Sequence, residues 1–293
     1  MSFADGFTPA SPEYFAPLPD LSMALERMGL DPNGDYSPSR ENLQTLMFGC
    51  FDNIPFEALD CSDYRRKLDL SPAHLFDKIV LNRRGGYCFE INGFFYALLT
   101  DLGYDCIPLA GRLLFDRQVF TGMRHRTTVV RIDGRRYLCD VGYGSGLAAD
   151  GPLDIDESGK QELDGKIFTI EQHPGAQFGD ITLIRHHDDG KETLVYTVYL
   201  TPHTVMDFIP ANEMTEVTFR TRRVCRKRTS TGSVAVDGKI FRRRVGEETI
   251  EEEITGYPHL YQILVDEFDM IVPRTTFSED WPKEFATYGL KKD

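Results

Sequence analysis

One short stretch of the sequence contains a candidate nucleophile. Residues 84–92, RGGYCFEIN, place Cys88 two positions after a pair of glycines and at the expected start of a helix. Glycines allow another chain segment to approach closely. The partial positive charge of a helix N-terminus favours a thiolate over a thiol, so Cys88 could attack a carbonyl carbon. The alternative is a buried, unreactive cysteine that begins a core helix.

A candidate base for this thiol is His125, which begins a strand that leads into Asp133-Gly134. Asp-Gly between alternating segments is a strong signal for a two-residue hairpin loop. With that loop, Thr127 faces Asp140 across the hairpin. His125 then lies diagonally from Asp140 on the same face, within reach of its carboxylate. A slip of one residue in the register would put His125 and Asp140 on opposite faces of the hairpin. The alternative interpretation of His125 is a surface histidine that happens to lie near an acid.

Together, Cys88, His125 and Asp140 form a candidate triad for acyl transfer. His125 would take the thiol proton, and Asp140 would orient and stabilise the imidazolium. The triad leaves open whether the acyl acceptor is water, an amine or another nucleophile. The other six histidines stand in polar or turn-like contexts, and we expect most of them at the surface.

Helices, strands and a mixed tail follow one another along the chain. Hydrophobic spacing predicts helices near 21–28 and 43–51, from residue 71, and from Cys88 to Gly103. Strands are expected at 107–115, 127–132, 137–141, 168–171, 181–185 and 194–200. Two more strands near 218–224 and 233–241 and a helix near 259–268 complete the chain. This order indicates an α+β protein of about three parts, with an antiparallel sheet or barrel in the middle.

Composition excludes several classes of protein. The 293 residues carry a net charge of -13, which argues against a nucleic-acid binder. No stretch approaches the roughly 20 apolar residues of a membrane helix, so no membrane partner is expected. The start of the chain does not look like a secretory signal. The six cysteines form no CxxC pair, so we expect neither disulfides nor a metal site, and the predicted location is the reducing cytoplasm.

These motifs resemble the arylamine N-acetyltransferase family. RGGYCFEINGFF matches the family's nucleophile motif, and residues 121–125, TGMRH, match the segment that ends in its histidine. Residues 132–137 and 140–144 match the hairpin and its aspartate, while IPFE at 54–57 matches an upstream element. Asp207, Phe208 and Asn212 match the entry to the family's lid. The resemblance covers residues from about 20 to about 270.

The resemblance implies a fold and a division of the chain. A helical bundle would carry the nucleophile in residues 1–104. A β-barrel would carry the histidine and aspartate in 105–206, and an α/β lid would follow in 207–293. This fold is related to cysteine proteases and transglutaminases.

The resemblance also implies a ping-pong activity of the kind found in xenobiotic metabolism. Cys88 would take an acetyl group from acetyl-CoA, a cosubstrate rather than a tightly bound cofactor, and pass it to an arylamine, arylhydrazine or arylhydroxylamine. Phe56 and Tyr143 would line the acceptor pocket, and Thr121 and Gly122 would lie beside the thiol end of coenzyme A. In the family, the residues that match Arg84 and Glu57 form a structural ion pair.

Two departures from the family pattern keep an alternative open. Ala58 stands where the family usually has asparagine, and residues 213–217 replace a Ser-Thr-His-Pro segment that follows the lid asparagine in many members. That segment helps to form the cleft for coenzyme A and acceptor. The alternatives are a malonyl-CoA-dependent N-acyltransferase and a macrolactam-forming amide synthase. A peptidase or transglutaminase, or an inactive scaffold, fits the motifs less well.

Residues 220–244 form a basic window in this acidic chain. They contain ten Lys and Arg and one Asp, a net charge of +9. Guanidinium groups suit phosphate, so one interpretation is a site for the phosphates of coenzyme A. The other is a solvated hairpin face balanced by the glutamates at 247, 248 and 251–253.

Overall fold

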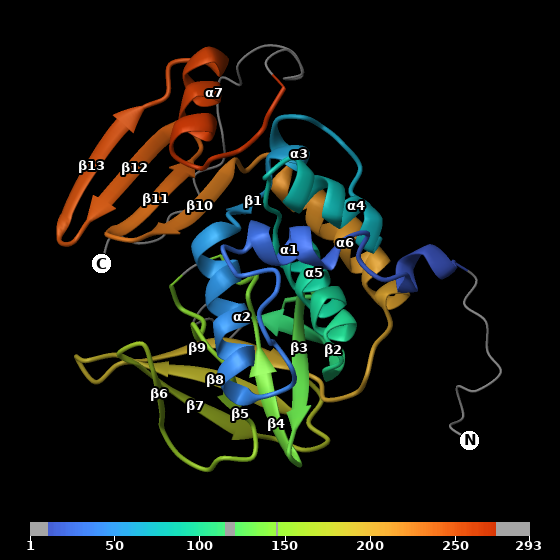
Figure 1. The fold of residues 1–293 in the computed structure, drawn as a ribbon. Helices are drawn as coiled ribbons and strands as arrows, with labels where there is room; N and C mark the ends of the chain where they lie inside the picture. Colours follow the sequence, from blue (N-terminus) through green and yellow to red (C-terminus); the bar gives the residue numbers. More distant parts are fainter. Residues whose placement is uncertain (1–10, 115–120, 145, 274–293) are drawn as a thin grey trace.

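The structure is a computed structural model that describes residues 11–114, 121–144 and 146–273. Figure 1 shows a group of helices in the centre, a large sheet below them and a smaller sheet with one helix at the upper left. The helices are α1 (Leu21–Arg27), α2 (Arg40–Asn53), α3 (Leu59–Ser62), α4 (Pro72–Phe76), α5 (Cys88–Asp101), α6 (Val205–Phe219) and α7 (Tyr257–Asp266). A 3-10 turn, η1 (Pro12–Phe15), precedes them, and a π-helical turn, η2 (Asp77–Leu81), follows α4.

Polar side chains fix the beginnings of the first helices. Asp20 accepts a hydrogen bond from the Met23 amide at 2.9 Å, and Ser39 accepts one from the Asn42 amide at 3.0 Å. Each bond satisfies an amide that the helix itself leaves without a partner. The predicted helices at 21–28, 43–51 and 88–103 are confirmed, with small differences at their ends.

An eight-stranded antiparallel sheet forms the middle of the chain and curves into a nearly closed barrel. Its order is β5-β4-β3-β2-β9-β8-β7-β6. The strands are β2 (Asp105–Leu113), β3 (His125–Ile132), β4 (Arg135–Cys139), β5 (Leu153–Asp154), β6 (Gln161–Leu163), β7 (Lys166–Gln172), β8 (Ile181–His186) and β9 (Glu192–Val198). All six predicted strands are present, and the α+β fold with a central antiparallel barrel is confirmed.

The hairpin between β3 and β4 has the predicted register. Asp133 and Gly134 have φ values of 50° and 79°, the left-handed conformation that a type I′ turn requires at both positions. Ile132 pairs with Arg135, so the two turn residues alone form the loop.

Strand β3 is buried on both faces. Val129 packs with Leu109 and Leu138 inside the barrel. Its neighbour Val130 points to the other side and joins the core under the helices, which includes Leu98 of α5. The active-site histidine candidate at the start of β3 therefore lies between a helix layer and the barrel interior.

A five-stranded antiparallel sheet forms the C-terminal part, in the order β1-β10-β11-β12-β13. Its strands are β1 (Phe56–Glu57), β10 (Val224–Thr229), β11 (Gly232–Asp237), β12 (Ile240–Val245) and β13 (Glu248–Glu253). Helix α7 packs on this sheet through an apolar cluster that includes Val236, Phe241 and Leu264. Strand β1 comes from the N-terminal part of the chain. The division of the chain into parts 1–104, 105–206 and 207–293 stays a prediction.

Two strand predictions in this region are wrong. The segment 218–224 does not form a strand, because α6 continues through Phe219 and β10 begins only at Val224. The β-branched residues there suggested a strand, whereas burial of Val205, Phe208 and Asn212 at helical spacing selects the helix. The segment 233–241 is two strands rather than one, since β11 ends at Asp237 and a turn leads into β12.

None of the helices in the described ranges combines the length and apolar character that a membrane span requires. Among the described residues, no group of three or more His, Cys, Asp or Glu is arranged to hold a metal ion.

Candidate active site

The loop before α5 places Cys88 at the first position of that helix. A side chain at Gly85 is excluded, because its Cβ would lie 1.7 Å from the carbonyl oxygen of Pro55. At Gly86 a Cβ would lie 2.5 Å from the Cβ of Glu90. Gly85 therefore lets the nucleophile loop lie directly against the segment that leads into β1, and Gly86 leaves room for the Glu90 side chain.

The three predicted catalytic residues come together at one end of β3. Nε2 of His125 lies 2.6 Å from Oδ2 of Asp140. Because Nε2 bonds to Asp140, Nδ1 is the nitrogen of His125 that can form a hydrogen bond with Cys88. The Cys88 thiol also donates to the carbonyl oxygen of Arg124 at 3.5 Å. All three side chains are buried.

Asn92 connects the nucleophile helix to the aspartate. It lies four residues after Cys88 and thus on the same face of α5. Its side-chain amide donates to Oδ1 of Asp140 at 2.9 Å and to the carbonyl oxygen of Arg126 at 2.6 Å. Its oxygen accepts from the amide of Val141 at 3.0 Å. Asn92 therefore fixes the distance between α5 and the hairpin that carries the histidine and the aspartate.

The charges around His125 favour the imidazolium. Burial by itself lowers the pKa of His125, but the Asp140 carboxylate and hydrogen bonding with Cys88 outweigh it and raise the pKa to about 10. At neutral pH the ring is therefore protonated, with Nε2 facing the Asp140 carboxylate and Nδ1 left to face the sulfur of Cys88. Such an arrangement lets a cysteine act as a thiolate without a separate deprotonation step.

Aromatic rings line the site beside the histidine. Tyr143 and Tyr196 lie with ring centroids 5.6 Å and 5.0 Å from that of His125. Phe56, on β1, packs with the apolar cluster that contains Cys88 and leaves no room for a side chain at Gly144. The two residues assigned to the acceptor pocket, Phe56 and Tyr143, therefore both lie at the site.

The two residues assigned to the coenzyme A thiol lie in the segment that leads into β3. Thr121 donates to the carbonyl oxygen of Leu113 at 3.0 Å, and its own carbonyl accepts from Arg112 at 2.7 Å. Gly122 lies beside the Arg124 side chain. These contacts tie Thr121 to β2, and a role in donor binding stays a prediction.

A cluster of buried charges supports the nucleophile loop from behind. Lys78 on η2 lies 2.6 Å from Glu90, 2.7 Å from Asp60 and 3.6 Å from Glu57. Arg84 pairs with Glu57 at 2.7 Å, which confirms the predicted ion pair. Glu90 also accepts from the amide of Tyr87 at 3.2 Å, so it holds the first turn of α5.

Glu90 has an unusual environment within this cluster. Burial and the neighbouring carboxylates Glu57 and Asp60 raise its pKa, while Lys78 lowers it, and the pKa is about 7. Direct contact with Lys78 thus favours the charged form of the carboxylate that holds the start of the nucleophile helix.

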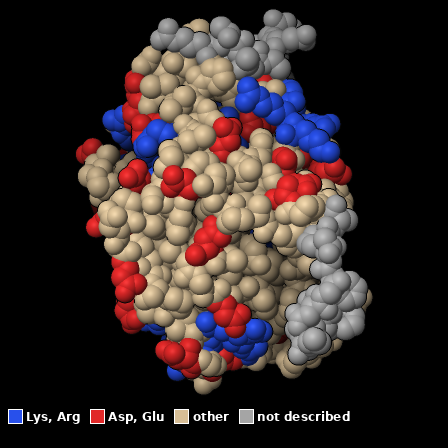
Figure 2. Space-filling model, turned by 45° about the vertical axis from the view of Figure 1, so that its right-hand side comes forward, with Lys and Arg blue, Asp and Glu red and all other residues tan. Residues whose placement is uncertain are grey.

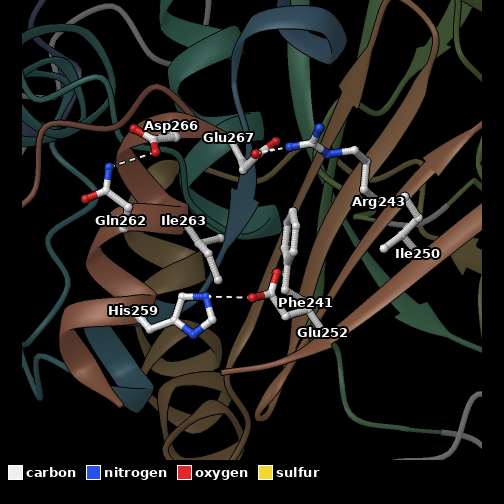
Figure 3. A pocket seen from close by; sticks show the side chains of 9 residues that line it. All are labelled: Phe241, Arg243, Ile250, Glu252, His259, Gln262, Ile263, Asp266 and Glu267. Carbon is white, nitrogen blue, oxygen red and sulfur yellow. Dashed lines mark hydrogen bonds and ion pairs between the residues drawn. The ribbon is translucent and has the colours of Figure 1, made fainter. Parts of the chain in front are cut away.

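At least half of the ten basic residues in the window pair with acidic side chains. Arg223 is fully buried and pairs with Asp63 at 3.0 Å. Figure 3 shows Arg243 pointing from β12 to Glu267 at the end of α7, and His259 of α7 facing Glu252 at 3.2 Å. Further pairs within or from the window are Arg226–Asp237, Arg228–Asp52 and Arg242–Glu251. These pairs favour the balanced hairpin face over a phosphate site that spans the whole window.

A profile of the N-acetyltransferase family matches residues 40–277. The chain belongs to the arylamine N-acetyltransferase family. It is 26% identical over 287 residues to human arylamine N-acetyltransferase 1, covering 87% of this chain and 95% of that protein. Proansamycin X synthase of Amycolatopsis mediterranei is 28% identical over 240 residues, covering 79% of this chain and 88% of that protein.

Solved structures agree with this membership. The arylamine N-acetyltransferase of Nocardia farcinica superposes with a TM-score of 0.76 at 27% identity, covering 92% of this chain and 96% of that chain. Enzymes of the arylamine N-acetyltransferase family are acyltransferases, and the buried thiol at the start of α5 is where such chemistry would begin.

Sequence reasoning gave no role to three residues that contact or support the candidate site. Asn92 was in the motif, and its spacing of four from Cys88 would have placed it on the same helix face. Tyr196 lies on β9, and no local signal pairs it with the histidine. The carboxylate of Glu90 forms an ion pair with Lys78, and no pattern in the sequence indicates that these two residues meet.

We expect Asp140→Asn to change the pH dependence of Cys88 alkylation by iodoacetamide. Without the carboxylate, the largest contribution that raises the pKa of His125 is lost while burial still lowers it, so the imidazolium becomes less stable near pH 7. In the original protein the imidazolium persists until pH rises to about 10. Alkylation of the variant at pH 7 should slow by about tenfold or more, and its rate should rise only at higher pH.

Asp156→Asn is the matched control, because Asp156 pairs with Arg136 on the surface and should leave the profile unchanged. Identical pH profiles for Asp140→Asn and the original protein would contradict the assigned role of the carboxylate.

Proposed function

We propose that this protein transfers acetyl groups from acetyl-CoA to arylamines, arylhydrazines or arylhydroxylamines by a ping-pong mechanism. The observation that carries the proposal is the arrangement of Cys88, His125 and Asp140, with 2.6 Å between the histidine and the aspartate. Membership in the arylamine N-acetyltransferase family supports the substrate class.

The first half of the cycle makes an acetyl-cysteine. The Cys88 sulfur forms a bond to the thioester carbonyl carbon, and the bond from that carbon to the coenzyme A sulfur breaks. The departing thiolate takes the proton that His125 holds, so coenzyme A leaves as a thiol. Asp140 keeps the imidazole in position throughout.

The second half returns the thiol to its starting state. An amine nitrogen attacks the acetyl carbon, and the bond to the Cys88 sulfur breaks. The neutral His125 accepts the proton that the amine loses, which restores the imidazolium and the thiolate together. Phe56 and Tyr143 would hold the aromatic ring of the acceptor against the site.

Cysteine chemistry fits a reducing setting such as the cytoplasm. All six cysteines are free in the structure. Burial raises the pKa of the other five thiols, including Cys106, whose pKa is about 11. Those five are therefore poor nucleophiles near neutral pH, and Cys88 is the residue expected to carry the acyl group.

An alternative keeps the same thiol but changes donor or acceptor, as in a malonyl-CoA-dependent N-acyltransferase or a macrolactam-forming amide synthase. The observation that favours it is helix α6, which runs without interruption through residues 213–217, where many family members have a Ser-Thr-His-Pro segment. The similarity to proansamycin X synthase keeps this second activity in consideration.

The test is intact mass measurement after incubation with a panel of acyl-CoA donors, followed by one arylamine acceptor. We expect a single acetyl group from acetyl-CoA, located on Cys88 and lost when the amine is added. Faster acylation by malonyl-CoA would support the alternative, and a folded protein that takes no acyl group from any donor would contradict the proposal.

A further inference from the structure

A pocket of about 620 Å³ lies between the loop after α3 and the last turns of α6. The loop contributes Arg65, Arg66 and Lys67, and the helix contributes Glu213, Val217 and Arg220. Four cations thus share a concave surface in a protein whose net charge is -13. On the face drawn in Figure 2, acidic side chains are spread widely and basic ones gather in a few places.

The carboxylates of the pocket are already engaged. Glu213 pairs with Lys67 at 3.3 Å. Glu216 is buried and accepts from the side-chain amide of Asn212 at 3.0 Å and from the amide of Leu68 at 3.4 Å. Both acids therefore already have hydrogen-bond or ion-pair partners within the described part of the chain.

Two guanidinium groups remain to bind an anion. Arg65 donates to the carbonyl oxygens of Cys61 and Arg220, at 3.2 Å and 2.8 Å, and so joins two helix ends. Arg66 lies over the ring of Tyr64, 5.1 Å from its centroid. In the part of the chain that the structure describes, neither Arg66 nor the Arg220 side chain forms an ion pair with a carboxylate. Both side chains are exposed at the pocket.

The same turn of α6 connects this pocket to the nucleophile. Thr218, next to Val217, accepts a hydrogen bond from Arg124 at 3.0 Å, and the Arg124 carbonyl accepts from the Cys88 thiol. Phe219 packs on the ring of Tyr87 with 5.2 Å between centroids. The last turn of α6 therefore lies between the pocket and the thiol of Cys88.

Continuation of α6 is what creates the pocket. The helix runs through residues 213–217 and ends at Phe219, which brings Arg220 opposite the loop of Arg65 and Arg66. A planar guanidinium group can donate two parallel hydrogen bonds to the oxygens of one phosphate. Such charge-assisted hydrogen bonds are about twice as strong as hydrogen bonds between neutral groups.

We propose that Arg66 and Arg220 bind the phosphate groups of the coenzyme A donor while its thioester reaches Cys88. This inference rests on the proposed function. A coenzyme A thioester has its reactive carbonyl at one end of a long flexible arm and its phosphates at the other, which suits a cation pocket set apart from the thiol. It replaces the earlier interpretation in which the basic window as a whole would bind these phosphates.

The test compares two acetyl donors in the double variant Arg66→Gln, Arg220→Gln. Acetyl-CoA carries phosphates, whereas p-nitrophenyl acetate does not. We expect KM for acetyl-CoA to rise about tenfold or more, since two charge-assisted hydrogen bonds are lost. Turnover of p-nitrophenyl acetate should stay within about twofold. The control is Lys160→Gln, Arg244→Gln, which removes two exposed charges elsewhere and should change neither value.

Binding of free coenzyme A, measured by calorimetry, separates this inference from the proposed function. We expect the original protein to bind coenzyme A and the double variant to bind it about tenfold or more weakly. Absence of binding to the original protein, or equal affinity in the double variant, would overturn the phosphate pocket. Binding that depends on the two arginines without any transfer to Cys88 would support the pocket and contradict the proposed function instead.

Discussion

Replacing Cys88 with Ala should abolish acyl transfer while leaving the fold intact. The side chain is small and its loss removes the sulfur that interacts with His125, so no acyl-enzyme can form at this position. We expect kcat to fall by a factor on the order of 10⁴ to 10⁶, as is typical when a nucleophile is removed from a triad. The measurements are steady-state transfer to an arylamine and the intact mass after incubation with acetyl-CoA.

Cys106→Ala is the matched control, because this thiol is half-buried and burial raises its pKa to about 11. It should retain most of the activity and the acetyl adduct. An adduct of equal yield in Cys88→Ala would show that the nucleophile lies elsewhere.

Replacing Lys78 with Met should strongly destabilise the protein. The ammonium group contacts Glu90, Asp60 and Glu57, all of them buried, and the variant removes this shared partner, while Arg84 still pairs with Glu57 and Asp60. Breaking a buried ion cluster by removing one partner costs about 3–5 kcal/mol of unfolding free energy. Thermal unfolding should show a midpoint lower by on the order of 10 °C.

This loss should depend on pH in a definite direction. Without Lys78 the pKa of Glu90 rises above its present value of about 7, so the folded state holds a proton that the unfolded state releases above its ordinary 4.5. The destabilisation should therefore be larger at pH 8 than at pH 5.5. Lys67→Met removes an exposed lysine and should cost less than about 0.5 kcal/mol. Equal losses for the two variants, or a loss that does not change with pH, would contradict this account.

The hairpin shows which part of the site can be predicted from sequence. Asp133-Gly134 allows the left-handed backbone that a two-residue loop needs, and the loop then fixes every pair along both strands. His125 and Asp140 follow from that register without any long-range information. Cys88 was predictable for the same reason, since two glycines and the start of a helix are local features.

The parts that could not be predicted depend on contacts between distant segments. Helix α6 contains β-branched residues near its end, and its helical state depends on burial, including that of Asn212, which accepts from Tyr87 at 2.6 Å. The charge cluster needs Lys78 to meet acids from two other segments. Arg126 was equally unexpected, because its guanidinium is fully buried beside the ring of Phe208, 4.8 Å from its centroid. Burial lowers the pKa of Arg126 to about 10.

Strand β1 has a consequence for how this protein can be divided. Its two residues pair with β10 of the C-terminal sheet, while the amide of Glu57 donates to the carbonyl of Gly86 at 2.9 Å. Phe56, which lines the site, belongs to this strand. The C-terminal sheet is therefore not an appendage that truncation could remove to leave a working core. Cutting it away would expose the edge of β1 and loosen the segment that packs Phe56 and the nucleophile loop against the candidate site.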